Sequence, residues 1–192
     1  MKCTILFASP RGEQSNTLFL TRAFQSEWTA MEHTADFFSL YDLSIAPCRA
    51  CRGCQQDWEH PACVIRDDMD AIFESILSSD WIVLASPIYS WYCTAPLKAS
   101  LDRCVYALNK FYGESVGPAL WKGKRVAILT TCGYRPEKGA DLFEQGVRRL
   151  CKHSGLIYSG MLAERHTSYK IPFSSPDKAQ RARDFAREIL AK

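Results

Sequence analysis

The chain lacks the short motifs that mark several large classes of enzymes and cofactor-binding proteins. It contains no G-x-G-x-x-G turn, no Walker loop, no H-E-x-x-H pair and no G-x-S-x-G elbow. These absences argue against the common nucleotide-binding loops, zinc peptidases and α/β-hydrolases. None of the four histidines belongs to an H-E-x-x-H pair, so we expect surface or hydrogen-bonded side chains at His33, His60, His153 and His166.

Long apolar runs and blocks of like charge are also missing. No segment is apolar enough to span a bilayer, and a strand-like run begins at Lys2 with no signal peptide before it. The 24 basic and 21 acidic residues give a net charge of only +3 and form no cluster typical of nucleic-acid or membrane binding. We therefore expect a cytoplasmic protein that binds neither nucleic acids nor membranes.

Cysteine, in contrast, is abundant. Nine cysteines, an odd number, in a chain without a signal peptide indicate reduced thiols or a metal site rather than a secreted disulfide framework. The length of 192 residues and the apolar content of 47% predict one globular domain over residues 1–192, with a cysteine-rich insertion at about 46–65.

Short apolar runs alternate with segments of helical periodicity along the chain. Strands are predicted at 2–8, 34–40, 81–85, 125–131 and 156–162. Apolar stripes predict a helix after each, over 20–31, 69–77, 97–108, 143–151 and 182–189. This alternation predicts an α/β fold with a doubly wound five-stranded parallel sheet, in three layers. Ligands bind such sheets beyond the carboxyl ends of the strands, so the loops after the first, third and fourth strands are expected to converge.

The loop after the first strand has the chemistry of a phosphate-binding turn. It leads from a strand to a helix N-terminus, where free backbone N–H groups and the helix dipole favour an anion. Its hydroxyl, amide and guanidinium donors are Ser9, Arg11, Ser15, Asn16 and Thr17. Alternatively, Ser15 or Asn16 only caps the helix and Arg11 is a solvated charge.

The loops after the third and fourth strands offer a flat, partly aromatic surface. A proline stiffens the first of them and fixes backbone groups that suit the edge of a heteroaromatic ring. Gly133 permits close backbone approach in the second. The candidate binding residues here are Pro87, Ile88, Tyr89, Ser90, Trp91, Thr131 and Gly133. Alternatively, the aromatic residues simply fold over the core.

Together these loops resemble the flavodoxin-like NAD(P)H-dependent FMN reductase family. The likeness rests on the 9–17 loop and on Ser86-Pro87-Ile88-Tyr89, and it extends over roughly residues 2–165, including the segments 67–83 and 97–103. The resemblance implies a flavodoxin-like fold with FMN as cofactor. The first loop would hold the FMN phosphate, and the second and third loops would frame the isoalloxazine ring.

The cysteine-rich insertion carries a possible metal motif of its own. Three thiols at two-residue gaps, followed by a fourth, can ligate a cubane cluster, and these are Cys48, Cys51, Cys54 and Cys63. The pattern resembles that of iron–sulfur flavoproteins, although its last gap is longer than usual. Free or redox-active thiols, a [4Fe–4S] cluster, and a zinc site in which His60 could replace one cysteine all remain open.

Two functions fit the sequence. The first is an FMN-dependent oxidoreductase that takes hydride from NAD(P)H and reduces a small acceptor such as a quinone or free flavin. The second is an electron carrier, either flavodoxin-like with FMN alone or an iron–sulfur flavoprotein with FMN and a cluster, that exchanges single electrons with a protein partner. The Tyr89–Trp91 surface favours the enzyme, for which we name no catalytic residue, because flavin and nicotinamide carry the chemistry. We also expect a homodimer or larger assembly.

Overall fold

A five-stranded parallel sheet forms the centre of the computed structural model, which describes residues 1–191. Its strands are β1 (Lys2–Phe7), β2 (Thr34–Ser39), β3 (Trp81–Pro87), β4 (Arg125–Cys132) and β5 (Ile157–Arg165). They pair in the order β2-β1-β3-β4-β5, and every pairing is parallel. The predicted α/β fold is confirmed. The main difference lies at β5, which continues three residues beyond the expected end at 162.

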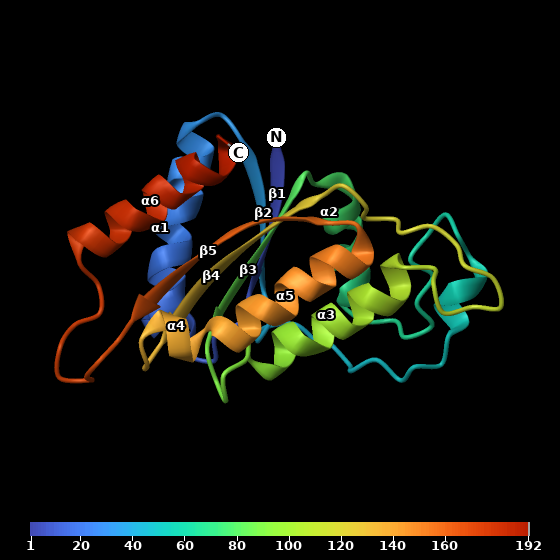
Figure 1. Cartoon of the computed structure of the whole chain (residues 1–192), viewed down its shortest axis with the longest axis horizontal. Coiled ribbons are helices and arrows are strands. Elements are labelled where there is room, and N and C mark those ends of the chain that lie inside the picture. Colours follow the sequence, from blue (N-terminus) through green and yellow to red (C-terminus); the bar gives the residue numbers. More distant parts are fainter. Residues whose placement is uncertain (192) are drawn as a thin grey trace.

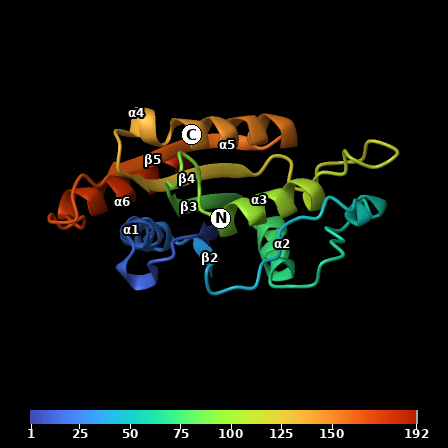
Figure 2. The ribbon, with the colours of Figure 1, turned by 90° about the horizontal axis from the view of Figure 1, so that it is seen from below.

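Helices cover both faces of this sheet (Figure 1). One face carries α1 (Asn16–Ala30) and α6 (Pro176–Leu190), which pack against each other. The other face carries α2 (Met69–Ser78), α3 (Ala95–Leu108) and α5 (Asp141–Ser154). Three short elements complete the fold: η1 (Gly12–Gln14), η2 (Gly53–Gln56) and α4 (Pro136–Gly139). The insertion of about 46–65 includes η2 and projects past the end of α3, beside the segment 110–120 (Figures 1 and 2).

Alternation along the strands divides the apolar residues between two cores. Ile5 of β1 and Val83 of β3 face α1 and α6, whereas their neighbours Leu6 and Leu84 face α2, α3 and α5. Successive side chains of a strand point to opposite faces, so a sheet covered on both sides requires nearly continuous apolar strands. That requirement explains why the sequence pattern located β1, β3 and β4.

Hydrogen bonds hold the carboxyl ends of the central strands together. The Ala8 amide donates to the Ala85 carbonyl at 2.8 Å, and the Ile88 amide donates to the Thr131 carbonyl at 2.8 Å. The Thr130 hydroxyl donates to the Ser86 carbonyl at 2.7 Å. Between β1 and β3 the strand order reverses, which is where doubly wound sheets bind ligands. Within residues 1–191, no helix has both the length and the hydropathy to cross a bilayer.

Leu84→Ala is expected to lower the free energy of unfolding by about 2–5 kcal/mol, because it leaves a cavity in the core beneath β3. Leu84 is 1% exposed, whereas Leu142, at the start of α5, is 53% exposed. The same substitution at Leu142 therefore serves as the control and is expected to change stability by less than about 0.5 kcal/mol. Urea denaturation measures both, and equal losses would contradict this account of the core.

Candidate functional site

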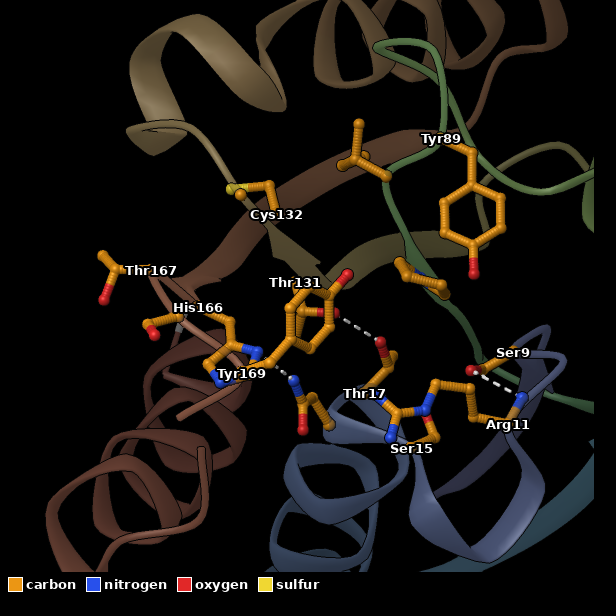
Figure 3. A pocket seen from close by; sticks show the side chains of 15 residues that line it. Ser9, Arg11, Ser15, Thr17, Tyr89, Thr131, Cys132, His166, Thr167 and Tyr169 are labelled. Atoms are coloured by element: carbon orange, nitrogen blue, oxygen red, sulfur yellow. Dashed lines mark hydrogen bonds between the residues drawn. The ribbon is translucent and has the colours of Figure 1, made fainter. Parts of the chain in front are cut away.

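A cavity of about 360 Å³ opens at the carboxyl edge of the sheet (Figure 3). Side chains from the loops after β1, β3, β4 and β5 line it. The sequence-predicted residues that it brings together are Ser9, Arg11, Ser15, Asn16, Thr17, Pro87, Ile88, Tyr89, Thr131 and Gly133. The three loops expected to converge therefore do meet, although they come from distant parts of the chain.

The first loop presents the N-terminus of α1 to this cavity. Ser15 is the N-cap of α1, and its hydroxyl oxygen accepts a hydrogen bond from the Leu18 amide at 3.2 Å. The first backbone bond of the helix joins the Phe19 amide to the Ser15 carbonyl. The amides of Asn16 and Thr17 precede that bond, so the helix offers them no acceptor. Ser15 thus caps the helix, as the alternative interpretation held, and it lines the cavity as well.

The charge of the cavity favours an anion. Arg11 lies at its rim, and none of its lining side chains within the described chain is a carboxylate. Of the ion pairs formed within residues 1–191, none involves Arg11. The Arg11 guanidinium and the positive end of the α1 dipole therefore act on the same space without a counter-charge.

Two side-chain hydrogen bonds join α1 to the far wall of the cavity. The Thr17 and Thr131 hydroxyls lie 2.8 Å apart and are buried, and the Asn16 amide lies 3.0 Å from His166 Nδ1. His166 Nε2 lies 3.0 Å from the Ile171 carbonyl, which can only accept. The proton is therefore on Nε2, and Nδ1 accepts from the Asn16 side chain. His166 is hydrogen-bonded, as expected of the histidines, and it also lines the cavity.

Ser90 and Trp91 do not line the cavity, unlike the rest of their predicted group. They form the tip of a tight turn in which Tyr89 and Tyr92 exchange backbone hydrogen bonds. Both tip residues have a positive φ, 51° and 61°, which costs about 1–3 kcal/mol for each non-glycine residue. This turn directs Trp91 onto Tyr134, with stacked rings 5.9 Å apart, and its indole N–H donates to the Lys138 carbonyl at 3.1 Å.

Sequence reasoning missed Cys132 and the segment after β5. His166, Thr167, Ser168 and Tyr169 line the cavity, and Tyr169 is 93% exposed. The sequence does indicate this segment. It is polar and aromatic and it follows the last strand, so it is expected to reach the same edge of the sheet as the other loops.

The family model described as NADPH-dependent FMN reductase matches residues 1–145. The chain belongs to this family. The resemblance stated on the loops after β1 and β3 is confirmed, and the matched residues include the β4 loop as well. The segment 166–169 lies outside the matched residues. Only the structure, and not the family match, therefore identifies it as part of the cavity wall.

Individual relatives fall into two groups. An iron–sulfur flavoprotein of Methanosarcina thermophila is 36% identical over 127 residues, covering 64% of this chain and 63% of the relative. FMN-dependent NADH:quinone oxidoreductase 8 of Burkholderia lata is 31% identical over 142 residues, covering 69% of this chain and 67% of the relative. The alignments span 63%, 45% and 51% of three iron–sulfur flavoproteins, from about half to just under two thirds of their lengths.

The fold also matches solved structures over its whole length. The NAD(P)H:quinone oxidoreductase from Methanothermobacter marburgensis superposes with a TM-score of 0.73, covering 99% of this chain and 97% of that one. The sequence identity is 20%, so this comparison supports the fold alone.

The cysteine insertion forms a second, much smaller cavity of about 10 Å³. All four cysteines of the predicted motif line it: Cys48, Cys51, Cys54 and Cys63. It shares no lining residue with the first cavity and lies toward the other end of α3. Among residues 1–191, no three Cys, His, Asp or Glu side chains converge as ligands of a single metal ion.

Hydrogen bonds to sulfur are already present in the insertion. The Ala50 amide donates to Cys48 Sγ at 3.4 Å, and Gln55 Nε2 lies 3.6 Å from Cys54 Sγ. Cys54 in turn donates its thiol hydrogen to the Tyr106 carbonyl at 3.2 Å. The insertion therefore already places hydrogen-bond donors against two of its four sulfurs.

The remaining cysteines are buried, as expected of small apolar side chains. Burial raises the pKa of Cys3, Cys93 and Cys104 to about 12, and that of Cys151 to about 11. Burial also raises the pKa of Cys132, the one of these that lines the first cavity. These thiols stay protonated at neutral pH and are weak nucleophiles.

Thr17→Val is expected to destabilise the protein by about 1–3 kcal/mol, because it leaves the buried Thr131 hydroxyl without its partner. Thr131→Val is expected to act in the same way. The double variant is expected to lose less stability than the sum of the two single variants. This difference, measured by urea denaturation, is the coupling energy between the two hydroxyls. Strictly additive losses would contradict a direct bond between these hydroxyls.

Proposed function

We propose that this protein is an FMN-dependent oxidoreductase that takes hydride from NAD(P)H and passes electrons to a small acceptor such as a quinone. The observation that carries the proposal is the first cavity. A helix N-terminus, an unpaired guanidinium and buried hydroxyls face one side of it, and a stiffened loop that carries the exposed ring of Tyr89 forms the other. Membership in the FMN reductase family agrees with this arrangement.

The phosphate of FMN fits the Arg11 side of the cavity. The amides of Asn16 and Thr17 and the hydroxyls of Ser9 and Ser15 are donors there, and Arg11 supplies the positive charge. Ser15 can cap the helix and bind the phosphate at the same time. Its oxygen accepts from the Leu18 amide while its hydroxyl hydrogen remains available for the phosphate. These residues would fix the phosphate end of the cofactor.

The isoalloxazine ring fits the side formed by the β3 and β4 loops. The hydrogen bond from the Ile88 amide to the Thr131 carbonyl fixes the two loops relative to each other. A Cβ added at Gly133 would meet no protein atom within 4 Å, so the glycine leaves open space beside the cavity. Pro87 and Gly133 would therefore leave room for a flat ring between them.

The protein's part in the reaction is to bind and orient. Bound flavin supplies the chemistry, by accepting hydride and returning electrons. Tyr89, 51% exposed, and Tyr169 lie at the open side of the cavity, where a flat nicotinamide or quinone can pack against them. Because no carboxylate lines the cavity within the described chain, no acidic side chain repels the phosphates of the nucleotide.

Arg11→Gln is expected to weaken FMN binding about tenfold, or about 1.4 kcal/mol, because a charged donor to the phosphate is lost. Riboflavin has no phosphate, so its affinity is expected to be unchanged. Arg22→Gln is the matched control, since Arg22 pairs with Glu13 outside the cavity. Quenching of flavin fluorescence by the apoprotein measures all four affinities, and an equal loss for FMN and riboflavin would place the phosphate elsewhere.

The activity itself is tested with FMN-loaded protein under anaerobic conditions. One equivalent of NADH or NADPH is expected to bleach the flavin absorbance, and added quinone is expected to restore it over repeated cycles. If neither nucleotide reduces the flavin while reduced ferredoxin does, the protein is an electron carrier.

The carrier is the second candidate, and the cysteine cavity favours it. Four thiols share one small cavity with a buried guanidinium, and their chemistry suits an iron–sulfur cluster. Cys51 is exposed and Cys48 is half-buried, so these two can move as ligands close around a group larger than the present cavity. Four iron and four acid-labile sulfide per chain after anaerobic purification would support a [4Fe–4S] cluster. Zinc, or no metal, would support the zinc or free-thiol alternatives.

We also propose that the protein is a homodimer or a larger assembly. Trp58, in the insertion, is 46% exposed, which leaves an aromatic surface for a second copy. Phe111 and Tyr112, two further aromatic residues in the neighbouring segment 110–120, pack against His153 of their own chain. Light scattering tests this proposal, and a monomeric mass would refute it.

A further inference from the structure

Arg103, on α3, is a fully buried cation beside the cysteine cavity. Its side chain is 0% exposed and pairs with Asp67, which is 8% exposed, at 2.8 Å. Its Nη1 also donates to the Ala46 carbonyl at 3.0 Å, and its Nη2 donates to the Ile65 carbonyl at 3.1 Å. Ala46 and Ile65 mark the two ends of the cysteine insertion. One side chain therefore ties both ends of this loop to α3.

One hydrogen-bond donor of Arg103 has no acceptor among the described residues. Its Nε is buried, and within residues 1–191 it has no hydrogen-bond partner. Arg103 lines the cavity together with all four cysteines of the motif. The Cys63 sulfur lies near enough to act on the guanidinium both electrostatically and as a side-chain hydrogen-bond acceptor, although Nε itself has no partner in the described part of the chain. A buried, charged donor without an acceptor is unfavourable, and native proteins seldom retain one. The acceptor it lacks would be an electron-rich atom in the cavity.

The surroundings of the cavity are positive. Arg49 and Arg52 line it as well. Lys110, which is 0% exposed, donates its ammonium hydrogens to the carbonyls of Cys54 and His60 and so holds the middle of the insertion. A neutral thiol gains little from such surroundings, whereas a thiolate-ligated cluster, which is anionic, is stabilised by them.

We propose that Arg103 is the positioning residue of the cysteine cavity, and that its free Nε–H donates to a sulfur of an iron–sulfur cluster held by the four cysteines. Its Nη groups and Asp67 fix the ends of the loop, and its Nε raises the reduction potential of the cluster. A hydrogen bond to sulfur stabilises the reduced, more negative state, which is why the potential rises. This inference rests on the cluster of the second candidate function.

The test uses the full chain, purified anaerobically with its cofactors. Arg103→Lys keeps the positive charge beside Asp67 but removes Nε–H. We expect the variant to retain iron and sulfide, with its midpoint potential lowered by about 59 mV, equivalent to tenfold in a one-electron equilibrium. Arg148→Lys, the same exchange on the exposed face of α5, is the matched control and is expected to leave the potential unchanged.

A second variant covers the case in which Arg103→Lys does not fold, as judged by its FMN content. The double variant Arg103→Met/Asp67→Leu replaces the buried pair with apolar groups, an exchange that often preserves folding. It lacks Nε–H as well, so we expect the same lowering of the potential.

Two results would overturn the proposal, and they can be told apart. A folded, cluster-containing Arg103 variant with the wild-type potential would show that Nε has no part, while the cluster itself stands. Wild-type protein without iron and sulfide, even after anaerobic reconstitution, would remove both the cluster and the role of Arg103. FMN binding measured on the same sample would show whether the oxidoreductase proposal is affected.

Discussion

The hydroxyl of Thr94 forms the hydrogen bond on which the positions of the first cavity and of the cysteine insertion both depend. It donates to the Ala8 carbonyl at the end of β1 at 2.7 Å, while the Thr94 amide donates to the Ser86 hydroxyl at 3.1 Å. Thr94 is the N-cap residue of α3, so these bonds fix the start of that helix against β1 and β3 at the point where the strand order reverses. The first cavity lies at this point. The far half of α3 then carries the residues that hold the cysteine insertion.

This arrangement separates the two cavities. Thr94 and Arg103 are nine residues apart, which corresponds to about 14 Å along a helix at 1.5 Å per residue. Within one chain the insertion is therefore no part of the wall of the proposed flavin site, although α3 connects the two rigidly. The oxidoreductase proposal depends on the first cavity alone, whereas a carrier that contains a cluster requires both.

The sequence predicted the fold because both faces of the sheet are covered, which forces apolar strands and striped helices. Ten of its candidate binding residues line one cavity at the carboxyl edge of the sheet, because the topology brings the loops after β1, β3 and β4 together. Trp91 was predicted to line the site but does not line the cavity, because its direction depends on positive φ angles at residues 90 and 91, which non-glycine residues rarely adopt. The segment 166–169 was missed because only the loops after β1, β3 and β4 were expected to converge. The extension of β5 to Arg165 carries His166 to the same edge of the sheet.

The turn at Ser90 and Trp91 has a consequence for the evolution of this protein. Its left-handed backbone is unfavourable, and the contacts of the indole with Tyr134 and the Lys138 carbonyl offset part of that cost. Glycine at position 91 would relax the backbone and delete the aromatic ring at the same time. Selection for thermal stability and selection to keep an aromatic face beside the cavity therefore act in opposite directions at this one residue.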